Sequence, residues 1–112
     1  MAETFKSARL KNVGVTAQQL YTPPVSKKSI LIELDVANVS AEAVQCSVFY
    51  STSGTSEGNR FYIVKQAVVP ANDTLQVVAG QKIVIEAGHL IGVESSAATS
   101  IDVVSSILED VA

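Results

Sequence analysis

Apolar and polar residues alternate most clearly between residues 29 and 50. Every second residue after Ser29 is a large aliphatic one, in the series Ile30, Ile32, Leu34 and Val36. A period of two places these side chains on one face of a half-buried strand, so we expect Ile32 and Leu34 in the core. Residues 38–42 form a turn-like segment, and AVQCSVFY then alternates again. Two such runs predict an antiparallel strand pair.

Most of the remaining chain consists of short apolar runs separated by turn residues. Further strands are predicted at residues 60–69, 74–78, 82–86 and 90–95, with turns around Pro70, Gly80 and Gly88 between them. Residues 51–59 contain two glycines and no large apolar side chain, which is typical of a surface loop.

The two ends of the chain are less regular. Residues 4–16 predict one strand interrupted near Gly14, and residues 19–24 predict a short strand closed by two prolines. Residues 100–112 suit a helix or a strand by spacing, and their β-branched side chains favour a strand. The count is eight or nine short strands. The predicted fold is all-β, a single antiparallel β-sandwich or compact jelly roll over residues 1–112.

The composition indicates a protein that packs against other subunits. Charged residues make up 17% of the chain, against about 25% in an average globular protein. A surface with few charges loses little hydration when a partner covers it. The net charge is -3 and the only adjacent basic pair is Lys27-Lys28, so we expect no nucleic-acid partner. We expect no membrane partner, because no apolar run approaches about 20 residues. We expect no secretory signal, because the N-terminal MAETFKSARL is polar and lacks a hydrophobic core.

Residues that could carry chemistry are few and scattered, so we expect no enzyme, no cofactor and no metal site. The single cysteine, Cys46, excludes an internal disulfide, and its place in an apolar strand indicates a buried, inert thiol. The single histidine, His89, follows Gly88 and is interpreted as a turn residue. Glu33 and Asp35 share a strand face, which is more typical of a solvated surface than of an acid/base pair or a calcium site.

The order of the motifs resembles a class of small all-β virion proteins of tailed bacteriophages. The resemblance covers residues 20–109 and rests on LYTPPVSKKSILIELDVANVSAEAVQCSVFY, YIVKQAVVPANDTLQV, GQKIVIEAGHLIGVESS and SIDVVSSILE. It implies a structural protein, similar to head decoration (cement) proteins, and it carries over no catalytic residue.

The expected function is that of a capsid decoration protein that stabilises the phage head. It would be assembled in the host bacterial cytoplasm and located in the virion. Its partners would be the major capsid protein or other virion subunits, and copies of itself, with a trimer expected. The alternatives are a neck, tail or fibre subunit, and a glycan- or receptor-binding module.

Residues 1–12 form a candidate attachment arm. This segment combines three cations with two apolar anchors, whereas the rest of the chain has a surplus of acid. The alternative is an ordinary first strand of the sandwich. The expected interface residues are Phe5, Lys6, Arg9, Leu10 and Lys11.

Overall fold

Eight β-strands account for most of the described chain. The computed structural model describes residues 3–111, and side chains as far as Glu109. The strands are β1 (Thr4–Val13), β2 (Gln18–Tyr21), β3 (Lys28–Asn38), β4 (Val44–Ser51), β5 (Arg60–Val69), β6 (Thr74–Ile85), β7 (Leu90–Ser95) and β8 (Ile101–Val111). A 3-10 turn, η1 (Glu57–Asn59), precedes β5. The all-β prediction is therefore confirmed.

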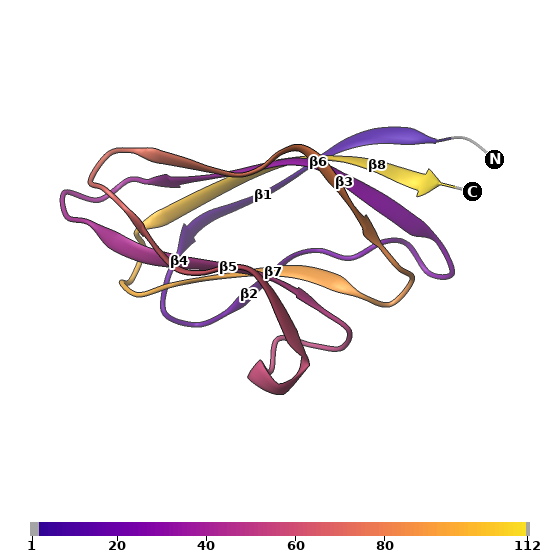
Figure 1. The fold of residues 1–112 in the computed structure, drawn as a ribbon, viewed down its shortest axis with the longest axis horizontal. Coiled ribbons are helices and arrows are strands. Elements are labelled where there is room, and N and C mark those ends of the chain that lie inside the picture. Colours follow the sequence, from indigo (N-terminus) through magenta and orange to yellow (C-terminus); the bar gives the residue numbers. More distant parts are fainter. Residues whose placement is uncertain (1–2, 112) are drawn as a thin grey trace.

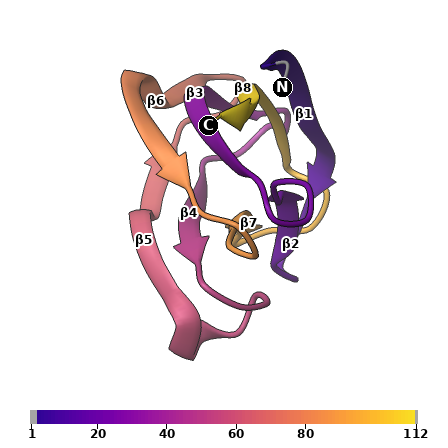
Figure 2. The ribbon, with the colours of Figure 1, turned by 90° about the vertical axis from the view of Figure 1, so that its right-hand side faces the viewer.

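The strands form two four-stranded sheets that face each other (Figures 1 and 2). The β1 sheet has the order β1-β8-β3-β6, and the β2 sheet has the order β2-β7-β4-β5. Neighbouring strands are antiparallel throughout. Apart from the β4–β5 hairpin, each connection crosses from one sheet to the other. This is the winding of a jelly roll, the more specific of the two predicted architectures. The antiparallel pair predicted from the two runs between residues 29 and 50 is therefore wrong, because β3 and β4 lie in different sheets.

A bulge in β3 changes which residues enter the core. Leu31 pairs with Ile107 of β8, but the next pair joins Glu33 to Ser106, so Ile32 is an extra residue in β3. Leu31 and Leu34 are both fully buried, one on each side of this bulge. The prediction for Leu34 is confirmed. The prediction for Ile32 is wrong, because Ile32 is half-buried and lies outside the core cluster.

Gly80 lies within a strand and does not reverse the chain. The sequence predicts two strands, at residues 74–78 and 82–86, whereas the structure has one strand, β6. The pairing with β3 shifts in register near this point, and Gly80 and Lys82 have φ values of 99° and 65°. A glycine adopts such a φ without strain, so it permits a bulge here as readily as a turn. The C-terminal segment is strand β8, the favoured alternative.

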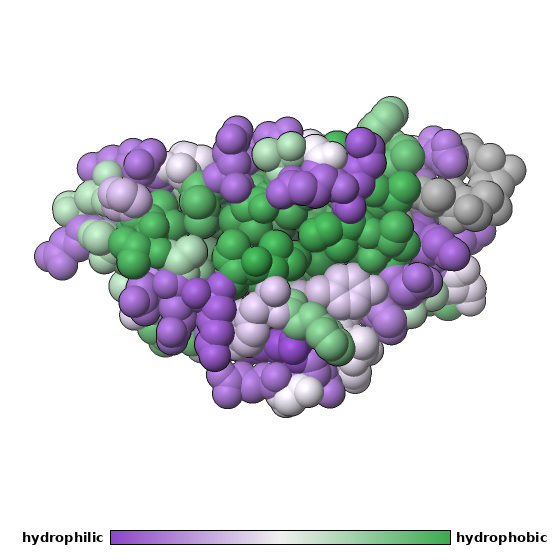
Figure 3. Space-filling view, in the orientation of Figure 1, coloured by the Kyte–Doolittle hydropathy of each residue, from purple (hydrophilic) through white to green (hydrophobic). Residues whose placement is uncertain are grey.

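The core fills the space between the two sheets. Its largest fully buried side chains include Leu31, Leu34, Ile85, Ile91 and Ile107. Along the side where edge strands β5 and β6 face each other, the core reaches the surface through the partly buried Ile63, Val64, Leu75 and Ile83. Figure 3 shows a broad hydrophobic area between the two layers in this view.

Candidate interaction surfaces

The expected interface residues at the N-terminus lie on strand β1. This strand pairs with β8 of the same chain, from Thr4 with Glu109 to Val13 with Ile101. The alternation of β1 divides the five expected residues between its two sides. Leu10 packs against the core, and Lys6 forms an ion pair with Glu109 at 3.6 Å. The remaining three, Phe5, Arg9 and Lys11, are exposed and share the outer side of the β1 sheet.

An apolar row crosses this outer side from edge to edge. It runs through direct cross-strand neighbours on β1, β8, β3 and β6, in the order Phe5, Leu108, Ile30 and Val84. We call these four residues the outer row. Phe5 is 76% exposed and Val84 50% exposed, while the two central residues are half-buried. The solvated face of an antiparallel sheet is ordinarily polar, so the outer row is an unusual apolar strip on an outward face.

Opposite charges lie beside the outer row, on strands that flank β8. Arg9 of β1 is level with Asp35 of β3, and both pair with Val104 of β8, which is 53% exposed. Glu33 lies on the same face. The adjacent Asp35 raises the pKa of Glu33, first through a hydrogen bond and then through its charge. Within the described residues no ion pair neutralises Arg9, Glu33 or Asp35.

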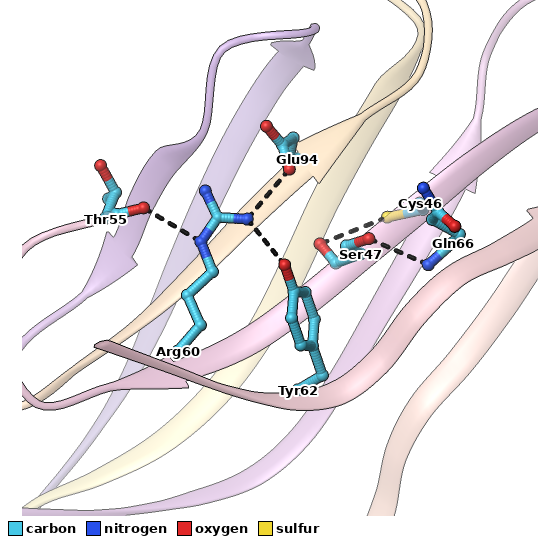
Figure 4. Close-up of polar contacts among 7 residues, drawn as sticks. All are labelled: Cys46, Ser47, Thr55, Arg60, Tyr62, Gln66 and Glu94. Atoms are coloured by element: carbon cyan, nitrogen blue, oxygen red, sulfur yellow. Dashed lines mark hydrogen bonds and ion pairs between the residues drawn. The ribbon is translucent and has the colours of Figure 1, made fainter. Parts of the chain in front are cut away.

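The outer side of the β2 sheet is built around a buried aromatic ring. Phe49 is fully buried but lies outside the core cluster. The guanidinium of Arg60 covers it, 4.2 Å from the ring centre, and the Tyr62 ring meets it edge-on. Arg60 donates hydrogen bonds to Glu94, to the Tyr62 hydroxyl and to the backbone oxygen of Thr55, at 3.0, 3.1 and 3.0 Å (Figure 4).

A small polar cavity lies beside this cluster. Its volume is about 250 Å³, and it is lined by Val15, Gln45, Ser47, Gln66, Glu94, Ser95 and Ser96. The hydroxyl of Ser47 accepts a hydrogen bond from the backbone nitrogen of Gln66, as Figure 4 shows. The hydroxyl of Ser96 accepts one from the backbone nitrogen of Gln45. Gln45, Gln66 and Glu94 also line the cavity, and the Glu94 carboxylate accepts the hydrogen bond from Arg60 described above.

His89 and Cys46, two of the residues considered above for chemistry, both pack against other parts of the sandwich. His89 lies in the predicted turn, and its Nδ1 is 2.7 Å from the Tyr50 hydroxyl, a partner that the sequence pattern does not reveal. The same hydroxyl accepts a hydrogen bond from the backbone nitrogen of Glu86. Cys46 is fully buried, and burial raises the pKa of its thiol to about 11. The prediction of a buried thiol is confirmed.

Two further findings concern the described residues. Among them, no group of three or more histidine, cysteine, aspartate or glutamate side chains is gathered as a metal site would need. No helix in the described part of the chain has the length and apolar character required to span a membrane.

Comparisons with known proteins identify the fold but no family. No family model matches the sequence, and no curated protein matches it. Among solved structures, the chain is similar to one from Bacillus endospore appendages, described as disulfide-linked pili. The TM-score is 0.56 at 12% identity, over 98% of this chain and 89% of that one.

Two other solved structures are similar over nearly their whole length. One belongs to the capsid of Helicobacter pylori bacteriophage KHP30, with a TM-score of 0.55 and 10% identity, covering 97% of this chain and 88% of that one. The other is the Drosophila NLP core, described in terms of pentamer formation and histone binding. Its TM-score is 0.51 at 11% identity, over 98% of this chain and 100% of that one. Identities this low show a shared fold alone.

Proposed function

We propose that this protein is a structural subunit of a phage virion, and within the virion a decoration (cement) protein on the head. The observation that carries the proposal is the fold shared with a chain of the KHP30 capsid. That match covers 97% of this chain and 88% of the other, so the two chains are of similar length. The sequence resemblance to small virion proteins of tailed phages supports the same assignment.

The surface of the sandwich suits a protein with many neighbours. The chain carries only 17% charged residues, and Phe5, Val84 and Val104 expose apolar side chains on one sheet face. Contacts of this kind dehydrate at little cost, and icosahedral symmetry repeats each of them many times. The proposed partners are the major capsid protein and further copies of the chain, and the proposed location is the virion, after assembly in the bacterial cytoplasm.

The test is binding of the purified protein to phage heads that lack it. We expect saturable co-sedimentation at a fixed number of copies per head, and density on the outer head surface in electron micrographs. Decorated heads should also release their DNA at a higher temperature than bare heads. An unrelated jelly-roll protein of similar size and charge is the control. Density confined to the neck, tail or fibres would replace the proposal with the alternative structural role, and absence of binding to any part would overturn both.

The cavity that Glu94 lines supports a second candidate function, the binding of a glycan. Amide and carboxylate groups at the mouth of a small concave site are suited to hydrogen-bonding sugar hydroxyls. A glycan array tests this function. Gln45→Ala, which removes one amide from the cavity wall, should reduce any signal, whereas Gln76→Ala on the other sheet should not. An array without signal for the unmodified protein would eliminate this candidate.

A further inference from the structure

We propose that the outer face of the β1 sheet binds a second copy of this chain, in a dimer whose two-fold axis runs along β8. The inference concerns self-association and does not rest on the proposed virion role. It differs from the trimer expected in the sequence analysis, which stays a prediction. The inference is drawn from the charges on this face, whose arrangement is complementary to itself under a two-fold rotation.

The strand order determines what such an axis brings together. On the outer face, β8 lies between β1 and β3. A two-fold axis along β8, in the plane between two facing sheets, lays β1 of each copy over β3 of the other. Heights along the strands are preserved by this rotation. Because Arg9, Val104 and Asp35 are level in the sheet, Arg9 of each copy then faces Asp35 of the other.

Three of the four residues of the outer row are matched by the same rotation, while Val84 on β6 lies outside the overlap. Phe5 of each copy lies over Ile30 of the other, and Leu108 meets the second copy's Leu108 on the axis. Val104 likewise meets its counterpart. The most exposed apolar side chain on this face, Phe5 at 76%, is therefore removed from water. Face-to-face packing of two sheets at about 10 Å, with strands within about 30° of each other, accommodates these contacts.

The charges on the outer face favour a second copy as the partner and a two-fold axis that runs along β8. A surface that fits this face must present an acid opposite Arg9 and a cation opposite Asp35, at the spacing of two strands. A second copy presents both groups at that spacing. An axis across the strands would instead lay β1 on β1 and place cations against cations. The pair Glu33 and Asp35 adds to the argument, since the pKa of Glu33 is raised in a single copy, where neither carboxyl has a basic partner among the described residues.

The size of the contact indicates a reversible dimer. The overlapping area spans β1, β8 and β3, or about 14 Å across the strands at roughly 4.8 Å per strand. It spans about 20 Å along them, from Phe5 to Lys11, at about 3.4 Å per residue. This footprint of about 300 Å² per copy is well below the roughly 800 Å² per partner of a standard interface, so we expect a weak dimer with a dissociation constant of about 0.1–1 mM.

Sedimentation over a range of concentrations tests the dimer, and a pair of charge reversals tests its geometry. Arg9→Glu and Asp35→Lys each place like charges opposite each other across the interface, and each should weaken dimerisation by about tenfold or more. An equimolar mixture of the two variants should dimerise again. In the mixed dimer, the new acid on β1 of one copy lies near the new cation on β3 of the other. The second contact between the two copies keeps its native charges. Phe5→Ser should also weaken the dimer. Lys65→Glu, an equal change of charge on β5 of the other sheet, is the matched control and should have no effect.

Phe5, Arg9 and Lys65 are exposed and Asp35 is half-buried, and circular dichroism melting checks that every variant folds. A chain that stays monomeric at about 1 mM would overturn the inference, since even a millimolar dissociation constant leaves much of it paired there. A trimer by mass would overturn it, and so would a dimer that survives both Arg9→Glu and Phe5→Ser. If the mixture of variants remains monomeric, the two-fold axis along β8 is wrong. If the wild-type protein is monomeric and these variants no longer bind phage heads, the outer face of the β1 sheet binds the capsid and not a second copy.

Discussion

The ring of Phe49 lies directly over Gly92, its cross-strand neighbour on β7. A Cβ built on Gly92 would lie 2.3 Å from Phe49 Cζ, far inside van der Waals contact. The Arg60 guanidinium covers the opposite side of the ring, 4.2 Å from its centre. A glycine beneath and an arginine above thus bury an aromatic side chain on the outer side of a sheet, and the close approach requires the absence of a side chain at position 92.

Gly92→Ala is therefore expected to destabilise the protein. The added methyl group must displace a ring that is held on both sides, and overpacking of this kind costs about 1–3 kcal/mol. Urea denaturation measures the free energy of unfolding. Gly58→Ala is the control, because a Cβ at Gly58 meets nothing within 4 Å. Phe49→Leu should recover part of the loss in the Gly92→Ala background. Equal stability of the two alanine variants would contradict the packing described here.

Truncations on β3 should distinguish the two sides of its bulge. Leu34 is fully buried, so Leu34→Ala should lower the free energy of unfolding by about 2–5 kcal/mol. Ile32→Ala should cost clearly less, since Ile32 is half-buried and outside the core cluster. Both variants remove apolar carbons from one strand, which makes them a matched pair. If Ile32→Ala proved as costly as Leu34→Ala, the bulge would be misplaced.

The Arg60–Glu94 pair should contribute more to stability than an exposed ion pair. The Arg60 side chain is only 5% exposed. Arg60→Ala removes the cover of Phe49 and leaves Glu94 without its cation, and we expect a loss of about 3 kcal/mol. Arg60→Lys keeps the charge but not the planar group on the ring. Its free energy of unfolding should therefore lie between those of the wild type and Arg60→Ala. The control is Lys6→Ala. The Lys6 side chain is 55% exposed, so its ion pair with Glu109 should contribute about 0–1 kcal/mol.

Tyr21 should make stability depend on alkaline pH. Burial, assisted by the hydrogen bond to Glu109, raises the pKa of Tyr21 from 10.0 to about 12. Below pH 10 the hydroxyl keeps its proton in both states, so its stabilising effect is fully present. From pH 10 to about 12 the unfolded chain loses this proton while the folded chain retains it, so stability falls with rising pH.

Comparison with Tyr21→Phe isolates this effect from other titrating groups. The variant lacks the hydrogen bonds to Ser29 and Glu109, so it should be less stable than the wild type below pH 10. The difference in free energy of unfolding should shrink between pH 10 and about 12. A difference that stays constant across this window would show that the hydroxyl titrates normally in the folded protein.

Cys46 should be unreactive in the native state. It is fully buried, and burial raises the pKa of its thiol to about 11. A thiol-reactive dye should therefore modify it only as fast as the protein opens, and immediately in denaturant. Leu34→Ala should accelerate the reaction through its lower stability. Rapid modification of the folded wild type would contradict the burial of Cys46.

The sequence by itself determined the all-β class, most strand positions, the loop before β5, and the burial of Leu34 and Cys46. It did so because alternation and turn residues act over a few neighbouring positions, where the backbone alone imposes a period of two. A bulge breaks that period without a distinctive residue. The sequence pattern therefore did not predict that the buried positions of β3 shift at Ile32. It also did not predict that β6 continues through Gly80.

Only the tertiary structure decided which residues share a surface. Phe5 and Leu108 come from opposite ends of the chain and become direct neighbours through the pairing of β1 with β8. The approach of Phe49 to Gly92 likewise depends on the register of β4 against β7. Register is set by the packing of the whole sandwich, because a slip of one residue would exchange the buried and exposed sides of a strand. Surfaces assembled from distant strands therefore carry no signal in any short stretch of sequence.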